Sequence, residues 1–104
     1  MKLSNLVLVA GAALLAASAS YAAEDAIAQK AGCLACHSKD KKIVGPAYKD
    51  VAAKYKGQNV EAKLVEKVRK GGVGVWGQIP MPPNPPDKIN DADLKAVVEW
   101  VLKG

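Results

Sequence analysis

The sequence predicts an all-α fold of about four helices in one small domain. Three observations favour it. Apolar residues recur three or four positions apart in separate segments, which is the spacing of one helix face. No segment shows the residue pattern of a β-strand. Glycines and prolines stand between the segments, where they end helices. The chain has 104 residues, which suits a single domain.

Residues 1–22 are predicted to be a secretory signal peptide. Lys2 is the only charge there, an apolar run follows, and Ser20 and Ala22 occupy the two small-residue positions before a cleavage site. A retained membrane anchor is the alternative, but the apolar run is short against the ~20 residues of a spanning helix. We therefore expect export to the periplasm, no stable membrane insertion and a mature domain at 23–104.

The first two helices are expected in the first half of this domain. One covers Glu24–Cys36, with Glu24 and Asp25 at the positive end of the helix dipole. The other follows Pro46, which suits the first turn of a helix, and ends at Gly57. Its apolar residues recur at helical spacing: Tyr48, Val51, Ala52 and Tyr55.

Two further helices are expected in the second half. The third begins at Asn59 as N-cap and stops at Gly71-Gly72. The fourth begins at Asn90, with Asp93 three positions later. Its apolar stripe is wide enough to face a core and consists of Leu94, Val97, Val98, Val101 and Leu102.

The region Gly71–Asn90 is predicted to be a long, stiff, non-helical loop. It holds all but one of the six prolines, and proline fixes its own φ and pushes the preceding residue into extended geometry. Long ordered loops in small domains are usually functional. We therefore look for functional residues here.

The five residues from Cys33 to His37 form the pattern C-x-x-C-H, the attachment signature of c-type haem. Two thiols three positions apart on one helical turn can add to the two vinyl groups of one haem. His37, the only histidine, then lies under the iron. This predicts one covalently bound haem c, with Cys33 and Cys36 as thioethers and His37 as an axial iron ligand.

Other uses of the two cysteines fit less well. A disulfide between Cys33 and Cys36 would close a tiny loop and constrain the unfolded chain little. A thioredoxin-like redox pair needs a βαβ context, and no strand is predicted. Zinc would need four ligands, whereas Cys33, Cys36 and His37 supply three.

Met81 is the candidate for the second axial ligand. It is the only methionine left once Met1 is removed with the signal. A methionine often just fills a core, but Pro80 and Pro82-Pro83 rigidify the backbone on either side. Pairing histidine with methionine is the ligation of electron-transfer cytochromes. With both axial positions filled, the iron has no site for a substrate, which indicates one-electron transfer rather than catalysis.

The mature chain closely resembles the small bacterial class I cytochromes c of the c-551/c-552 group. The resemblance covers nearly all of it and rests on several segments in the right order. These are Gly32–His37, Val44–Ala52, Gly74–Gly77, Ile79–Asn84 and Trp100–Leu102. It implies a class I cytochrome c fold, with about four helices around one haem.

The resemblance also implies roles for five further residues. The Pro46 carbonyl would accept a hydrogen bond from His37, and Asn84 would donate one to the Met81 sulfur. Trp76 would hydrogen-bond a haem propionate, and Trp100 would pack near the haem. Plain core packing is the alternative for both tryptophans. Lys67 stands where relatives often carry an arginine near a propionate, so it would offer only a point charge.

A second departure from the family is the linker 84–90, which looks about three residues longer than usual.

The charge of the chain predicts the kind of partner. The formal net charge of +5 falls to +4 without Lys2, which favours redox proteins with acidic docking surfaces. Nucleic acid is not expected as a partner, because the chain is exported and lacks a clustered basic motif.

We expect a monomer that carries electrons between a respiratory donor and a terminal oxidase or reductase. Two rivals remain. In a haem-based ligand sensor or a peroxidase, Met81 would be a labile ligand. In a thiol–disulfide module, no haem would be bound and both thiols would be free.

Overall fold

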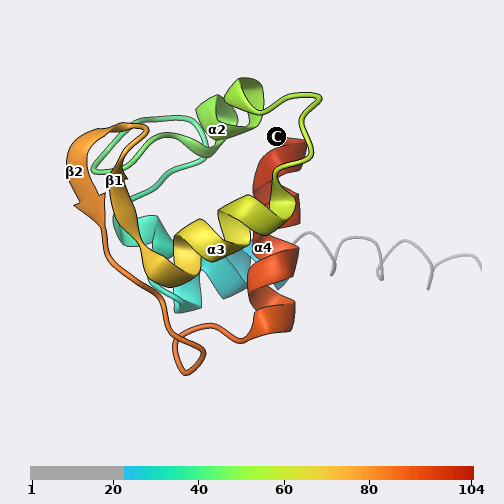
Figure 1. Ribbon diagram of the computed structural model, residues 1–104. Helices are drawn as coiled ribbons and strands as arrows, with labels where there is room; N and C mark the ends of the chain where they lie inside the picture. Colours follow the sequence, from blue (N-terminus) through green and yellow to red (C-terminus); the bar gives the residue numbers. More distant parts are fainter. Residues whose placement is uncertain (1–22) are drawn as a thin grey trace, which may run out of the picture.

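The computed structural model describes residues 23–104, and the expected signal peptide at 1–22 lies outside them (Figure 1). A helix over 23–30 comes first. The elements after it are a short 3₁₀ helix η1 (Cys33–Ala35), helices α2 (Tyr48–Lys54), α3 (Glu61–Lys70) and α4 (Asp91–Lys103), and strands β1 (Gly72–Gly74) and β2 (Gly77–Met81). The expected fold of about four helices is confirmed, with a small hairpin added.

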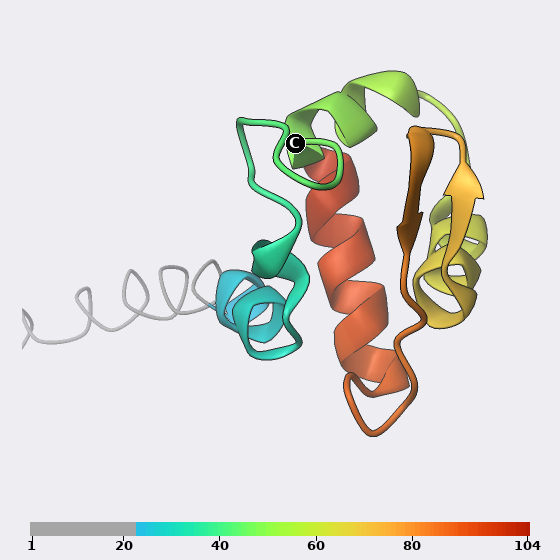
Figure 2. The ribbon, with the colours of Figure 1, turned by 90° about the vertical axis from the view of Figure 1, so that its left-hand side faces the viewer.

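Helix α4 is the centre of the molecule. Figure 2 shows the first helix on one side of α4 and α3 with the hairpin on the other, while α2 lies across its C-terminal end. The small core joins Ala28 and Ala31 of the first helix to Ile89 and α4. Its α4 members are Leu94, Val97 and Val98, and Leu64, Val65 and Val68 of α3 pack against this core. The expected apolar stripe of α4 therefore faces the core.

The first helix is shorter than the expected Glu24–Cys36. It ends at 30, and Gly32 follows in the left-handed conformation with φ +84°. Glycine adopts this conformation at no steric cost and commonly ends helices. The chain then turns again at η1, where the His37 amide donates to the Cys33 carbonyl at 2.9 Å. The two cysteines thus lie on a separate turn, set at an angle by Gly32.

Helices α2 and α3 differ from the prediction at their N-terminal ends, where each begins later than expected. The N-cap of α2 is Ala47, so Pro46 precedes the helix instead of occupying its first turn. Asn59 is not the cap of α3, since Val60 holds that position without a side-chain hydrogen bond. Pro46 has another role in the structure, because its carbonyl oxygen accepts a hydrogen bond from His37.

Asn90 caps α4 as predicted. Its side-chain oxygen accepts from the Asp93 amide at 2.8 Å, and its amide group donates to the Asp93 carboxylate at 3.1 Å. We predict that Asn90→Ala lowers the free energy of unfolding by about 1 kcal/mol. Asn59→Ala is the control and should change it by less than about 0.5 kcal/mol, because that side chain is exposed and caps nothing. Urea denaturation of the haem-loaded protein measures both, and equal losses would contradict the assignment.

The prediction of a loop over the whole of Gly71–Asn90 is wrong for its first part, which forms an antiparallel hairpin. Gly74 pairs with Gly77 and Gly72 with Met81, with an irregularity between the pairs. Val75 and Trp76 form the turn. Gly74 and Gly77 take φ values of +119° and +115° on either side of it, which alanine could not adopt without strain. The hairpin places Met81 at the end of β2.

Candidate cofactor site

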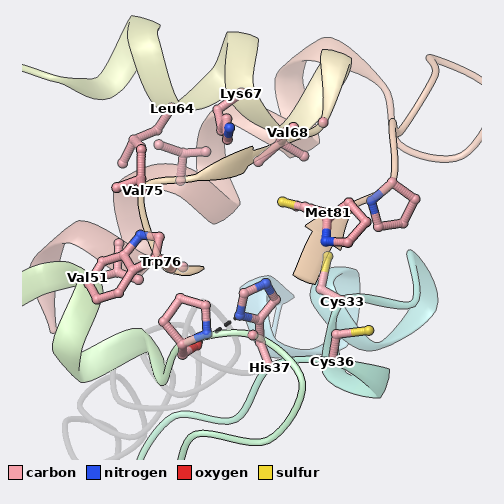
Figure 3. A pocket seen from close by; sticks show the side chains of 18 of the residues that line it. Cys33, Cys36, His37, Val51, Leu64, Lys67, Val68, Val75, Trp76 and Met81 are labelled. Atoms are coloured by element: carbon pink, nitrogen blue, oxygen red, sulfur yellow. Dashed lines mark hydrogen bonds between the residues drawn. The ribbon is translucent and has the colours of Figure 1, made fainter. Parts of the chain in front are cut away.

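A pocket of about 530 Å³ opens between the helices and the hairpin (Figure 3). Its size lies within the range of small-molecule and cofactor sites. All the candidate ligands and attachment residues line it: Cys33, Cys36, His37 and Met81. Most of the remaining lining is apolar and includes Val51, Leu64, Val68, Val73, Val75, Ile79, Leu94, Val97 and Val101. The structure therefore brings these residues together around one apolar space.

His37 is held from two sides. Its Nδ1 lies 2.8 Å from the Pro46 carbonyl oxygen, the contact that the family resemblance implies. Because a carbonyl oxygen only accepts, Nδ1 carries the proton, and Nε2 of the neutral ring keeps a free lone pair. The Tyr48 ring stacks on the imidazole, with centroids 5.1 Å apart and planes inclined by 20°. The imidazole is thus fixed in both tautomer and orientation.

Gly45 lies so close to the imidazole that no side chain fits. A Cβ built there would be 2.5 Å from Cε1 of His37. Its backbone has no positive φ, so this contact alone excludes alanine. We predict that Gly45→Ala lowers the free energy of unfolding by about 1–3 kcal/mol and shifts the NMR resonances of the His37 ring. Gly57→Ala is the control.

A Cβ at Gly57 would meet nothing within 4 Å, although its φ is +77°. Gly57→Ala should therefore cost some stability through the backbone and leave the His37 resonances in place. Unshifted His37 resonances in Gly45→Ala would contradict the proposed contact.

Met81 extends into the pocket from the end of β2 (Figure 3). The backbone around it is packed against the end of α3 at Gly71, where a Cβ would collide with the Met81 carbonyl oxygen and the Pro82 backbone. Gly71 also has φ +70°. The glycine expected to stop a helix therefore also lets the Met81 segment approach that helix.

Asn84 does not make the expected hydrogen bond to the Met81 sulfur. Its side-chain nitrogen donates to the carbonyl oxygens of Val68 and Pro82, each at 3.1 Å. Two donor protons serve two carbonyls, so none remains for sulfur. Asn84 is only 6% exposed, so its buried amide group needs hydrogen-bond partners, and these two carbonyls supply them. The Asn84 side chain therefore holds the segment after Met81 against α3.

The two tryptophans lie in different places. Trp76 lines the pocket from the hairpin turn and is 40% exposed, with the Lys54 Nζ 5.5 Å from its ring centroid. Trp100 is not among the residues that line the pocket. It packs edge-on against Tyr48, with ring centroids 5.7 Å apart. Trp100 therefore packs against Tyr48, whose ring stacks on His37.

The Cys33 thiol lacks the lowered pKa of a redox-active cysteine. Burial raises the pKa of the Cys33 thiol above its ordinary value, and the hydrogen bond with Tyr48 only partly offsets this. Thiol–disulfide exchange needs a readily formed thiolate, hence a lowered pKa. Within residues 23–104, no three His, Cys, Asp or Glu side chains come close enough to hold a metal ion by themselves.

Comparison with known proteins identifies the family. The sequence model of the family described as Cytochrome c matches residues 22–104, almost the whole described chain. The chain belongs to the cytochrome c family. As such it carries a covalently bound haem c with iron, and it is an electron carrier rather than an enzyme.

Its relatives are small cytochromes c. Cytochrome c-551 of Allochromatium vinosum is 56% identical over 84 residues, 80% of this chain and 87% of that protein. Cytochrome c-552 of Nitrosomonas europaea is 49% identical over 104 residues, 98% of this chain and 97% of that one.

Solved structures agree with these sequence relatives. The crystal structure of wild-type Nitrosomonas europaea cytochrome c552 superimposes with a TM-score of 0.70 at 48% identity, covering 76% of this chain and 96% of that one. Class 1 cytochrome MtoD of Sideroxydans lithotrophicus gives a TM-score of 0.69 at 34% identity, covering 80% and 94%. The chain therefore has the class I cytochrome c fold.

Sequence reasoning missed several residues that build this cytochrome site. Gly45 and the stacking of Tyr48 on His37 were not anticipated, nor was the packing of Gly71 against Met81. A glycine directly before Pro46 was the available signal for a close approach. No local pattern indicates which side chain stacks on a histidine eleven residues away.

Proposed function

We propose that this cytochrome is a periplasmic one-electron carrier between a respiratory donor and a terminal oxidase or reductase, with the haem iron ligated by His37 and Met81. One observation carries the proposal. Met81, the only methionine in 23–104, extends into the same pocket as an imidazole whose Nδ1 is already engaged.

The residues of the pocket fit haem c. Cys33 and Cys36 would hold it covalently, and the apolar lining suits a porphyrin plane. Burying roughly 400 Å² of porphyrin at ~25 cal/mol per Å² gives on the order of 10 kcal/mol. Leu94 is the only large side chain that is fully buried within the described residues. A buried cofactor would therefore supply much of the core that the side chains lack.

The axial residues would keep foreign ligands away from the iron. When bound, haem iron supplies the one-electron chemistry by changing between its ferric and ferrous states. The Pro46 carbonyl holds His37 with its Nε2 lone pair free. Met81 is held by the hairpin and by the packing at Gly71. Neither side chain changes charge with the electron, which favours little rearrangement.

Two residues would receive the acidic edge of the haem. Trp76 has an indole N–H at the pocket wall, and Lys67 lines the same pocket near Gly72. Donors of this kind suit a carboxylate, so we assign both to the haem propionates. Lys54, beside the Trp76 ring, adds positive charge to this side of the pocket.

The sequence supports the proposed location and partners. Within residues 23–104, no helix has the length and apolar character to cross a membrane. The signal-like residues 1–22 support export, and covalent haem attachment by this motif suits that compartment. The excess of Lys and Arg over Asp and Glu, 15 against 10, supports partners with acidic docking surfaces and a monomer that docks transiently. Electron-transfer rates should then fall as salt rises.

Two measurements on the exported protein test this proposal. The intact mass should equal residues 23–104 plus one haem. Carbon monoxide added to the reduced protein should not change the absorption spectrum within the mixing time, because His37 and Met81 would occupy both axial positions of the iron. Immediate binding would favour the sensor or peroxidase reading, with Met81 as a labile ligand. A colourless protein with two alkylatable thiols would favour the thiol module.

A further inference from the structure

Arg69 makes an unusual set of contacts near the end of α3. Its Nη1 donates to the carbonyl oxygens of Asn84 at 3.0 Å and Ile89 at 2.6 Å. Its Nη2 pairs with the Asp91 carboxylate at the start of α4. The Arg69 side chain is 17% exposed and Asp91 92% exposed. The two carbonyl contacts are therefore the sheltered part of this network.

These two carbonyls mark the ends of one exposed loop. Residues 85–88 are exposed, whereas Asn84 and Ile89 on either side of them are 6% and 5% exposed. Within the loop, the amides of Lys88 and Ile89 donate to the Pro85 carbonyl. A single guanidinium nitrogen thus joins both ends of the loop and closes its base.

The near end of the loop leads directly to Met81. Asn84 lies three residues after Met81, and its backbone amide donates to the carbonyls of Val68 and Arg69 at 3.2 and 3.1 Å. Its side chain adds the bonds to Val68 and Pro82. The Met81 segment is therefore attached to the last turns of α3 at Asn84, and Arg69 reinforces this attachment from the carbonyl side.

We propose that Arg69 is a positioning residue for the iron ligand Met81, acting by closing the base of loop 85–88 at Asn84 and Ile89. This inference rests on the proposed ligation by Met81. Without the guanidinium, opening of the exposed loop would spread through Asn84 to the ligand. With it, the loop can move while Met81 remains in place.

Arginine suits this geometry, because the N–H groups of Nη1 reach both carbonyls while Nη2 pairs with Asp91. The planar guanidinium presents several N–H donors in a fixed fork. A lysine ammonium is a point charge and cannot reproduce that fork. Arg69→Lys should therefore keep only part of the effect. Asp91→Asn should have little effect on Met81, because it leaves both carbonyl contacts intact.

The test compares Arg69→Gln with Lys70→Gln in the haem-loaded protein. Lys70 is the adjacent basic residue of α3, and its pair with Glu66 is exposed, so its loss should matter little. Guanidinium chloride titrations would follow two signals in the oxidised protein: the far-red band of sulfur bound to iron(III), and the circular dichroism of the helices. Imidazole binding to the iron would be measured without denaturant.

We expect Arg69→Gln to lose the far-red band at a lower denaturant concentration than the helices unfold, and imidazole to bind on the order of tenfold more tightly. Amide hydrogen exchange at Asn84 should accelerate by a similar factor. Lys70→Gln should behave as wild type in all three measurements.

Two results would separate a failure of the Arg69 inference from a failure of the proposed Met81 ligation. If the band and the helices of Arg69→Gln are lost together, with imidazole binding unchanged, Arg69 stabilises the fold only and the inference is wrong. If the wild-type protein has no far-red band, the proposed ligation fails instead. Exchange at Asn84 would then still show whether Arg69 holds this segment, and unchanged exchange would overturn that as well.

Discussion

Replacing Met81 with alanine should lower the reduction potential on the order of 0.1–0.3 V while the haem stays covalently attached through Cys33 and Cys36. A thioether ligand raises the potential of haem iron relative to harder ligands. Alanine offers no donor atom, so water or an added ligand would take the position above the iron. Redox titration of the purified variant measures the change.

The control for this variant is Gln78→Ala. Gln78 lies in the same strand β2 but is exposed and does not line the pocket. It should retain the wild-type potential and resist added cyanide, whereas Met81→Ala should bind cyanide at once. A wild-type potential in Met81→Ala would show that Met81 is not an iron ligand.

Replacing both cysteines, Cys33→Ala with Cys36→Ala, should abolish covalent haem attachment. Each single variant keeps one possible thioether bond, so attachment should be impaired but not lost. The double variant should show no haem stain on a denaturing gel. Since few side chains are fully buried without the cofactor, the double variant should also have much less stable helix by circular dichroism.

Ala35→Ser tests whether the sulfur atoms or the shape of the turn matter. Ala35 lies between the two cysteines in η1 and is exposed, so serine should fit without contact to the pocket. Its haem stain should equal that of wild type. Full staining of the double cysteine variant would refute thioether attachment.

The helical part of the fold could be read from the sequence because its signals are local. The apolar stripe of α4 and the cap at Asn90 each depend on residues within a few positions. The predicted first helix is too long because Gly32, inside the segment, takes the left-handed conformation and ends it. Asn59 resembles a cap, but the chain begins α3 two residues later.

The hairpin could not be predicted in the same way. Its strands carry Gly72, Gly74, Gly77 and Pro80 and show no regular alternation. Such residues discourage strands, yet glycines with positive φ allow this turn. A two-stranded hairpin has little stability alone, so its place beside the pocket depends on the rest of the molecule.

The site was partly visible in the sequence for a related reason. The motif Cys33 to His37 is contiguous, and Met81 stood out because no other methionine remained. The hydrogen bonds of Asn84 and Arg69 join segments 15 to 20 positions apart. Such contacts depend on how α3 packs beside the later loop, and spacing along the chain does not reveal them.

The absorption spectrum of the oxidised wild-type protein in the far red tests the central claim most directly. If His37 and Met81 both ligate the iron, the spectrum should show the weak band of sulfur bound to iron(III), and the band should be absent from Met81→Ala. A wild-type spectrum without that band, in a protein that binds cyanide as soon as it is added, would contradict the claim.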